Sequence, residues 1–135
     1  MLKRIDHIAI IVRNIEQALV FYRDTLGITT GVIKEVPTEH VRIAFLPMGG
    51  PGGSKIELIE PTSTDSSLSK FLEKRGEGLH HICLEVDDID AALAEMQEKG
   101  TPVLDKQPRI AAEGRAIFIH PKAANGVLLE LVERV

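Results

Sequence analysis

The chain has no tryptophan, one tyrosine and one cysteine in 135 residues, and aromatic residues make up only 4% of it. Its lysines and arginines are scattered, whereas a nucleic-acid-binding surface needs clustered basic residues. We therefore expect no nucleic acid partner. The single cysteine, Cys83, cannot form an internal disulfide, so no oxidising compartment is implied. Its neighbours Ile82 and Leu84 are apolar, which predicts a buried side chain rather than a nucleophile.

Long apolar runs are also absent. None approaches the roughly 20 residues that a membrane helix requires. The first residues, Met1-Leu2-Lys3-Arg4, lead directly into a strand pattern without the apolar core of a signal peptide. We expect a cytoplasmic protein with no membrane partner. With 44% hydrophobic and 27% charged residues and a formal net charge of −4, the composition is typical of one soluble domain, residues 1–135.

An internal repeat is the main pattern present. Asp6-His7-Ile8-Ala9-Ile10 precedes an amphipathic helix pattern, and His80-His81-Ile82-Cys83-Leu84 precedes another. Each copy ends in a strand pattern with one glutamate among aliphatic residues, Glu57 in the first and Glu130 in the second. The separations, 81−7 = 74 and 130−57 = 73, differ by one residue. Two histidines and two glutamates therefore occupy equivalent places in two modules.

Each module has a β-α-β-β-β pattern, which predicts an α+β fold with two paired modules forming a curved mixed sheet around a metal cup. Module one covers about 3–61, a connector about 62–77, and module two about 78–135. The expected elements of module one are a strand at 4–12, a helix at 15–26 capped by Asn14 and ended by Gly27, and strands at 28–35, 41–47 and 54–60. The connector contains a short helix at 68–74. Module two has a strand from Leu79, a helix capped by Asp88 and ended by Gly100, and strands at 102–105, 115–120 and 126–133.

Strand alternation places the four repeated side chains on the face that the helices leave open. Imidazole and carboxylate donors from rigid strands suit Zn, Co, Ni, Mn or Fe(II). Taken singly, each residue has a plainer explanation, since strand histidines are commonly hydrogen-bonded and strand glutamates commonly face water. Their matched placement favours a metal site formed by His7, Glu57, His81 and Glu130.

Other titratable residues are weaker candidates. We expect His40, His80 and His120 to be structural or exposed. Glu35 and Glu39 flank Pro37 in the turn between the second and third strands of module one, and either could reach the open face as a base. A solvated turn carboxylate is the alternative for both. Module two shows no evident counterpart of Glu39.

Several segments carry a family resemblance that spans almost the whole chain. They are Asp6-His7-Ile8-Ala9-Ile10, Phe21-Tyr22 ahead of Leu26-Gly27, Lys55-Ile56-Glu57-Leu58-Ile59-Glu60-Pro61, Gly78-Leu79-His80-His81-Ile82-Cys83-Leu84-Glu85-Val86-Asp87, and His120-Pro121-Lys122 leading to Gly126-Val127-Leu128-Leu129-Glu130-Leu131. The chain resembles the vicinal oxygen chelate superfamily, and within it the methylmalonyl-CoA epimerase family.

The resemblance implies a metal-dependent isomerase of propionyl-CoA metabolism. It would interconvert (2R)- and (2S)-methylmalonyl-CoA by α-proton abstraction through an enolate. By resemblance His7, His81 and Glu130 are metal ligands, and Glu57 fills a place where family members carry Gln or Glu. Glu39 looks like the family's acid/base glutamate, although the family's glycine after His40 is missing here, and Glu130 is the second such group. The resemblance also implies a homodimer, an acyl-CoA substrate and a divalent ion, either Co, Zn, Ni, Mn or Mg.

Three other functions are alternatives on the same fold. A glyoxalase I-like lyase would use the same ligands on a glutathione hemithioacetal. An oxygenase would need only two histidines and one carboxylate, which leaves Glu57 unexplained. A non-catalytic small-molecule-binding protein of the same fold would not need the four metal residues.

Overall fold

The computed structural model describes residues 1–135, which form two compact units. The central unit is residues 8–80, and the terminal unit is residues 1–7 together with 81–135. Strands β1 (Leu2–Ile11) and β5 (Gly78–Val86) contribute residues to both units. Each half of the chain has one strand, then a helix, then three strands, so the α+β class with two βαβββ modules is confirmed.

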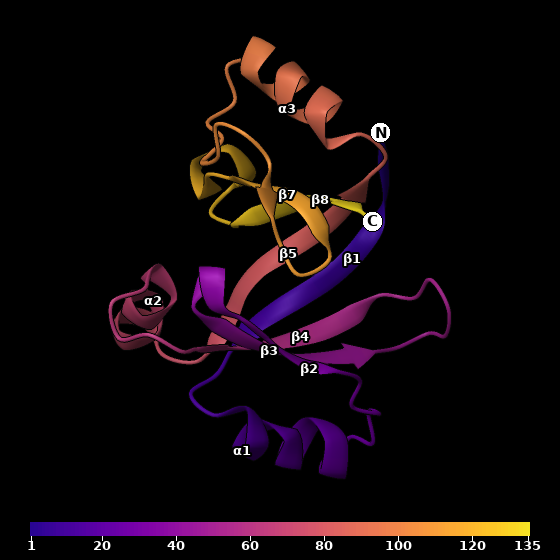
Figure 1. The fold of residues 1–135 in the computed structure, drawn as a ribbon, viewed down its shortest axis with the longest axis vertical. Helices are drawn as coiled ribbons and strands as arrows, with labels where there is room; N and C mark the ends of the chain where they lie inside the picture. The colour runs from indigo at the N-terminus through magenta and orange to yellow at the C-terminus, as the bar shows by residue number, and fades with distance from the viewer. The chain divides into compact units, whose positions relative to one another are not determined.

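The central unit contains a three-stranded antiparallel arrangement, β2-β3-β4, with a helical segment on one face (Figure 1). Its elements are α1 (Ile15–Leu19), a π-helical segment (Val20–Thr25), β2 (Ile33–Val36), a 3₁₀ turn (Pro37–Glu39), β3 (Val41–Pro47), β4 (Lys55–Pro61) and α2 (Ser67–Arg75). Strand β2 begins at Ile33 rather than at residue 28 as expected. The core packs Ile15 and Leu19 of α1 against Ala44, Leu46 and Leu58.

The first helix begins where the sequence predicts but does not continue as one α-helix. The Asn14 side chain accepts a hydrogen bond from the Gln17 backbone N–H at 2.8 Å, which confirms the N-cap. Beyond Leu19 the backbone widens, and the Leu26 N–H donates to the Phe21 carbonyl five residues back. This extra residue rotates Leu26 out of the apolar stripe, so Leu26 is 55% exposed instead of buried as expected.

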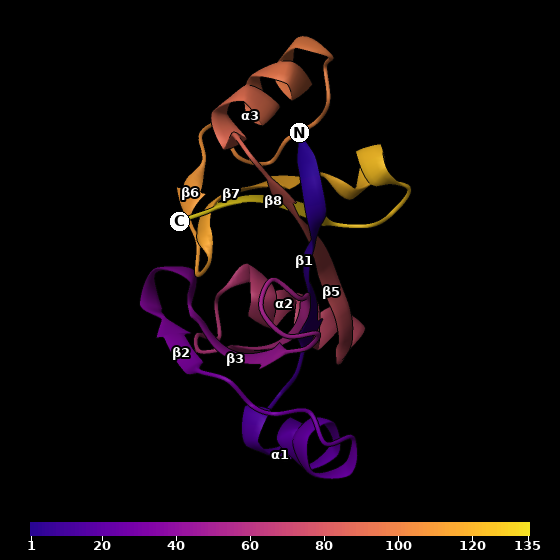
Figure 2. The same ribbon diagram turned by 90° about the vertical axis from the view of Figure 1, so that its right-hand side faces the viewer.

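The terminal unit contains β5 in parallel with β8, and then β7 and β6 in antiparallel order. Its remaining elements are α3 (Ile89–Glu98), β6 (Arg109–Ile110), β7 (Gly114–Ile119), a 3₁₀ turn (Pro121–Ala124) and β8 (Leu129–Arg134). Helix α3 lies over β7 and β8 (Figure 2) and is capped by the Asp88 side chain, as predicted. Its core joins Ile89 and Leu93 to Ile117 and Leu131.

The strand expected at 102–105 is wrong. Only Val103 makes an isolated bridge, to Ile119, and the strand that pairs with β7 is Arg109–Ile110. The physical reason lies at Asp105, whose carboxylate accepts the Phe118 backbone N–H at 2.6 Å. Because that donor is taken by a side chain, a continuous ladder cannot form there. The strand that precedes β7 is therefore Arg109–Ile110, and the turn between them comes later in the sequence than a strand at 102–105 implied.

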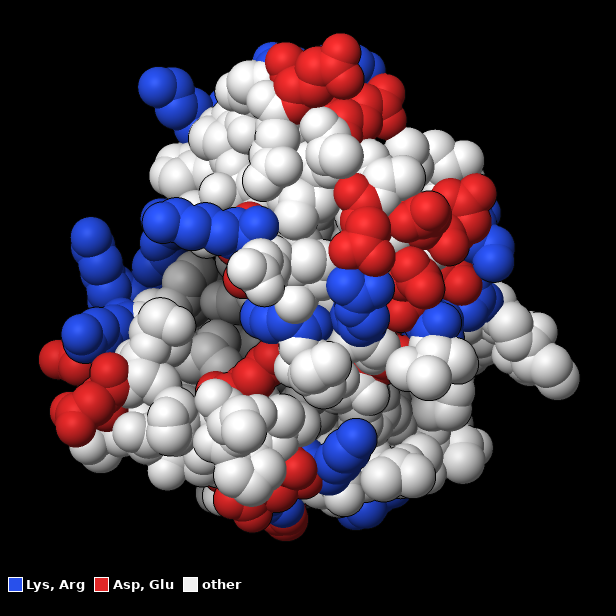
Figure 3. All heavy atoms as spheres, turned by 45° about the horizontal axis from the view of Figure 1, so that its top comes forward, with Lys and Arg blue, Asp and Glu red and all other residues white.

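The surface is mixed in charge. On the face drawn in Figure 3, lysines and arginines stand in several small groups, separated by acidic and uncharged residues. No helix has the length and apolar character needed to cross a membrane.

Candidate metal centre

The candidate site lies on the open face of the terminal unit, which we define as the sheet face that α3 does not cover. Cys83 of β5 stands beside Glu130 of β8, and Glu130 stands beside Phe118 of β7. Residues opposite each other in register share a face. The intervening residues, including Ile117 and Leu131, pack beneath α3. Glu130 therefore lies on the open face, beside Cys83 and Phe118.

Three of the predicted ligands converge there, and we call them the His-His-Glu triad. His7 Nε2 lies 3.3 Å from His81 Nε2, and Glu130 Oε1 lies 3.2 Å from His81 Nε2 and 3.5 Å from His7 Nε2. All three residues are buried. Donors of one zinc ion lie about 2.0–2.2 Å from it, so neighbouring donors stand roughly 3.0–3.5 Å apart. The triad can therefore hold a divalent ion.

His7 and Glu130 shift each other's pKa. Burial lowers the pKa of His7, but hydrogen bonds to Asp6 and Glu130 and the charge of Glu113 outweigh it and raise the pKa to about 9. Burial raises the pKa of Glu130, but hydrogen bonds from His7 and His81 and the charge of Arg109 hold it well below its usual range. Without a metal ion, a proton on His7 thus adds to the positive charge that Arg109 places beside Glu130.

Behind the triad, His7 is held by a buried carboxylate. Asp6 is fully buried, and its Oδ2 lies 2.7 Å from His7 Nδ1, while its Oδ1 accepts from Arg134 Nη1 at 2.7 Å. A carboxylate on Nδ1 fixes the ring so that Nε2 faces the ligand position. Asp6 is therefore an outer partner of the site, and the strand pattern alone did not reveal it.

Arg109 is a second residue that the sequence pattern missed. Its Nη2 donates to Glu130 Oε2 at 2.8 Å, and its guanidinium lies 4.2 Å from the centroid of the Phe118 ring. The guanidinium holds one oxygen of Glu130 so that the other faces the two histidines. The expected strand at 102–105 left Arg109 in a loop, so no alternation signal pointed to it.

Glu57 occupies the matching place in the central unit. It is 2% exposed on β4 and stands in register with Phe45, as Glu130 does with Phe118. The separations 118−45 = 73 and 130−57 = 73 are equal. Its neighbour Leu58 packs under α1, so Glu57 points to the other face of β4. This orientation agrees with the predicted one.

The two acidic residues expected in one turn lie in different elements. Glu39 ends the 3₁₀ turn Pro37–Glu39 between β2 and β3 and is partly buried. Glu35 is exposed in β2, in register with Arg42, and Arg42 donates to Glu16 of α1 at 2.8 Å. Glu35 therefore faces the α1 side of the sheet, which is a correction to its expected place in the turn. Only Glu39 lies in the turn where both were expected.

Glu113 is a carboxylate that sequence reasoning did not select. It lies in the connection between β6 and β7, its side chain is 6% exposed, and its Oε2 stands 3.8 Å from His7 Nδ1. The 73-residue offset between the modules maps Glu39 onto Ala112, the residue before Glu113. The expectation that module two has no counterpart of Glu39 therefore stays a prediction.

The remaining histidines and the cysteine behave as predicted. His80 contacts the Phe71 ring edge-on at 4.7 Å between centroids, and the His120 Nδ1 accepts the Lys122 backbone N–H. His40 is exposed, with a left-handed backbone at φ 54°. Cys83 is fully buried, and burial raises the pKa of its thiol, so it is not a nucleophile.

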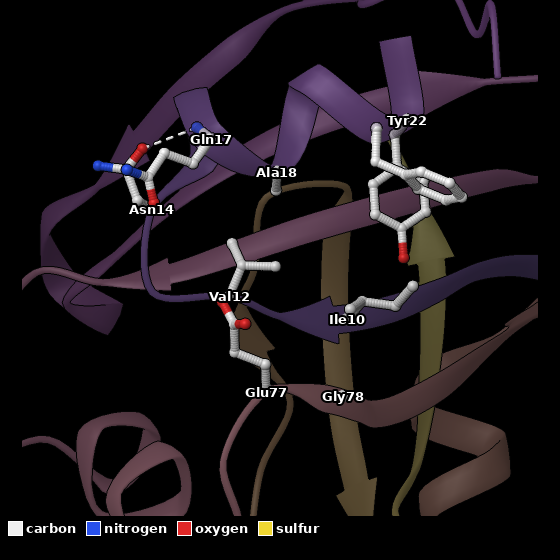
Figure 4. Close-up of a pocket in the computed structure, with 9 residues that line it drawn as sticks. Ile10, Val12, Asn14, Gln17, Ala18, Tyr22, Glu77 and Gly78 are labelled. Carbon is white, nitrogen blue, oxygen red and sulfur yellow. Dashed lines mark hydrogen bonds between the residues drawn. The ribbon is translucent and has the colours of Figure 1, made fainter. Parts of the chain in front are cut away.

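A pocket of about 360 Å³ lies in the central unit between β1 and the first helix (Figure 4). Ile10, Val12 and Ala18 line it, and the Tyr22 ring projects into it with its hydroxyl toward Ile10. None of the predicted ligands or acid/base residues lines this pocket. It is therefore separate from the candidate site.

Comparison with known proteins identifies the family of the chain. Residues 6–118 match the family model of the glyoxalase/bleomycin resistance protein/dioxygenase superfamily. The chain is 39% identical over 132 residues to the mitochondrial methylmalonyl-CoA epimerase of Mus musculus, covering 96% of this chain and 72% of the mouse protein. It is 41% identical over 134 residues to the ethylmalonyl-CoA/methylmalonyl-CoA epimerase of Cereibacter sphaeroides, covering 97% and 98% of the two chains.

A solved structure agrees over the same length. A variant of Streptomyces coelicolor methylmalonyl-CoA epimerase in complex with 2-nitronate-propionyl-CoA is 40% identical to this chain. It superposes with a TM-score of 0.92 and covers 100% of this chain and 99% of its own. The expected vicinal oxygen chelate fold is confirmed.

Proposed function

Because the chain belongs to the glyoxalase/bleomycin resistance protein/dioxygenase superfamily, and within it to the methylmalonyl-CoA epimerase family, we propose that it interconverts (2R)- and (2S)-methylmalonyl-CoA. The observation that carries this proposal is the convergence of His7 Nε2, His81 Nε2 and Glu130 Oε1 within 3.5 Å of one another. Relatives named as epimerases of the same substrate support the choice of acyl group.

The triad would supply three ligands to a divalent ion, with Glu57 as the fourth. A bound ion would stabilise the negative charge that develops on the thioester oxygen when the α-proton leaves. Asp6 keeps His7 Nε2 directed at the ligand position, and Arg109 keeps Glu130 Oε1 directed there. Cobalt, zinc, nickel, manganese and magnesium are all compatible with these donors, and metal analysis of purified protein distinguishes them.

Inversion at the α-carbon needs one proton-transfer group on each face of the planar enolate. We assign one of them to Glu39, since it lies in the turn between β2 and β3 and Glu35 faces α1. The family resemblance gives the second role to Glu130. Glu39→Gln should reduce inversion about 10²–10⁴-fold while metal content is unchanged.

The decisive experiment follows isotope and stereochemistry together. Metal-loaded protein is incubated with (2R)-methylmalonyl-CoA in deuterated water, and we expect deuterium at C2 with conversion to the 2S epimer. No exchange and no conversion would sink the proposal. Turnover of a glutathione hemithioacetal instead would assign a glyoxalase I-like function, and tight binding without turnover would assign a sequestering protein.

The metal site has its own test. His7→Ala should lose bound metal in elemental analysis and lose epimerisation, because a direct ligand is removed. His120→Ala, which changes an exposed histidine at a turn, should retain both. A His7→Ala protein with full metal and normal turnover would contradict the assignment.

Three broader features stay predictions. We propose that residues 1–135 act as one domain, that two copies form a homodimer, and that the protein is cytoplasmic. Sedimentation equilibrium of the metal-loaded protein tests the second, with a mass near twice the 14.8 kDa of one chain as the expected result.

A further inference from the structure

Asp6, the buried carboxylate behind His7, divides its two oxygens between a histidine and a cation. Its Oδ2 lies 2.7 Å from His7 Nδ1, and its Oδ1 accepts from Arg134 Nη1 at 2.7 Å. All three residues belong to the terminal unit. Because the two oxygens face different partners, the carboxylate cannot turn about its Cβ–Cγ bond without losing one of these contacts. Arg134 therefore helps to set the orientation in which Asp6 meets His7.

Strand alternation places Arg134 on the same face of β8 as a metal ligand. Arg134 is the last residue of β8, four positions after Glu130, so both side chains leave the same face of the strand. Glu133 leaves the other face, where its carboxylate accepts the backbone N–H of Ile89 at the start of α3 at 2.9 Å. One strand thus supplies both the ligand Glu130 and the cation that pairs with Asp6.

Beside Arg134, the neighbouring strand β7 contributes no side chain. Arg134 stands in register with Gly114. A Cβ atom at Gly114 would collide with the carbonyl oxygen of Glu133 and would stand 3.1 Å from the Cα atom of Arg134. Only glycine fits at this position, so the end of β8 lies close against β7. The backbone from which the Arg134 side chain extends is therefore well defined.

A second arginine, Arg4, lies near Asp6 but also serves another carboxylate. Arg4 Nε donates to Glu85 Oε1 at 2.7 Å, while Arg4 Nη2 stands 3.8 Å from Asp6 Oδ1. A separation of 3.8 Å is too long for a hydrogen bond, although the opposite charges still attract each other. Arg134 makes the shorter contact with Asp6, and that contact is a charge-assisted hydrogen bond.

We propose that Arg134 is a positioning residue of the metal centre, acting on the ion through Asp6 and His7; this inference rests on the metal centre of the proposed function. Arg134 holds Asp6 Oδ1, Asp6 Oδ2 holds His7 Nδ1, and His7 Nε2 is thereby directed at the ion. Without the guanidinium, the fully buried carboxylate loses a hydrogen-bonded cation and can turn away from His7. Arg134 itself takes no part in the proton transfers.

Metal affinity is the first test, measured without substrate by competition with a chelator. Arg134→Met keeps a long side chain but removes its charge and its N–H donors. We expect metal affinity to fall about 10–100-fold, as when other outer partners of ligands are removed. Arg134→Lys, which restores a cationic donor, should recover part of the loss. In the epimerisation assay, the ion concentration for half-maximal turnover should rise for Arg134→Met, while KM for the acyl-CoA stays at the wild-type value.

A double-mutant cycle shows whether Arg134 acts through Asp6. Asp6→Asn keeps the shape of the side chain but removes its charge. Adding Arg134→Met to Asp6→Asn should weaken metal binding much less than Arg134→Met does in the wild type, because the two residues act in one chain of contacts. Full additivity of the two losses would show that Arg134 acts independently of Asp6 and would overturn the inference.

Chemical rescue separates the lost donor from a general loss of structure. The Arg134 side chain is 36% exposed, so a small cation can reach its place. Guanidinium ion, well below denaturing concentrations, should tighten metal binding by Arg134→Ala. Tetramethylammonium, which carries the charge but no N–H donor, should not. Guanidinium should also fail to rescue Asp6→Asn, because the anionic acceptor is missing there.

Two other arginines supply matched controls. Arg4→Met, which removes the longer contact with Asp6, should weaken metal binding less than Arg134→Met does. Arg115→Met removes a surface ion pair with Asp90 and should bind the ion as the wild type does.

Each contrary outcome is distinct. Wild-type metal affinity in Arg134→Met, or an equal loss in Arg115→Met, would refute the positioning role. If circular dichroism shows that Arg134→Met does not fold, Arg134→Lys takes its place in the double-mutant cycle, and additivity again decides against the inference. Wild-type protein that binds the ion without epimerising (2R)-methylmalonyl-CoA would refute the proposed function alone, whereas wild-type protein that binds no ion would refute both.

Discussion

At the scale of single residues, the buried charges are balanced in pairs. Asp6 is matched by Arg134 and His7, and Glu130 by Arg109 and the two histidines. An ionised carboxylate is costly to bury unless such partners surround it. The same arrangement makes the site sensitive to the loss of a proton or of a cation.

Stability of the metal-free protein should depend on the charge of His7. Its pKa of about 9 exceeds the 6.5 of an unperturbed histidine, so the folded state binds the proton more tightly. The stabilisation is complete below pH 6.5 and is lost as pH rises through 9. A difference of this size is roughly 3 kcal/mol. Urea denaturation of metal-free protein between pH 6 and 10 should show this loss.

Two variants identify the group responsible for that pH dependence. His7→Gln should remove most of the slope, whereas His120→Gln should retain it, because His120 is an exposed residue at a turn. Stability of the metal-free wild type that is constant over this range would contradict the prediction.

Arg109 should control metal affinity through Glu130. Arg109→Met keeps a long side chain near Phe118 but removes the donor to Glu130 Oε2. We expect metal affinity to fall about 10–100-fold, as when outer partners of ligands are removed. Competition with a chelator measures it. Arg115→Met, which removes a surface ion pair with Asp90, is the control, and an equal loss there would show a nonspecific charge effect.

At the scale of elements, the π-helical segment decides which leucine contributes to the core. The α1 pattern predicted Leu19 and Leu26 in one stripe, and the structure buries Leu19 to 2% exposure while Leu26 remains 55% exposed. One additional residue in a helical turn shifts all later side chains around the axis. An apolar stripe assigned from regular α-helical spacing cannot predict that shift, because no residue type in the segment signals a π-helical turn.

The two leucines should therefore differ in their contribution to stability. Leu19→Ala should lower the free energy of unfolding by about 2–5 kcal/mol, the usual cost of emptying a buried leucine site. Leu26→Ala should cost less than about 1 kcal/mol. Urea denaturation of the two variants compares them directly, and equal losses would place Leu26 in the core after all.

At the scale of the whole molecule, the repeat allowed most of the fold to be predicted. It placed the capping residues Asn14 and Asp88, the open-face orientation of Glu57 and the convergence of His7, His81 and Glu130. The features that could not be predicted from the sequence are set by tertiary contacts. Asp105 displaced a strand by taking a backbone donor, and this hid Arg109 and Glu113. Asp6 was part of the quoted repeat, but its role became visible only through its contacts, which include Arg134 and His7.

The division into units also predicts which fragments can fold. A chain of residues 62–135, cut at the module boundary expected from sequence, lacks residues 1–7 of the terminal unit. These seven residues include His7 and Asp6, the hydrogen-bond acceptor of Arg134. We expect no cooperative unfolding transition and no metal binding from this fragment, measured by circular dichroism and calorimetry. A folded, metal-binding fragment would show that β1 is dispensable.

The contact between Asp6 and Arg134 joins residues 128 positions apart. During translation, Arg134 is therefore added 128 residues after Asp6. At about 5–20 residues per second, the early segment waits roughly 6–26 seconds for its partner. The terminal unit cannot be completed before that point, so the ion should load only after Arg134 has been synthesised.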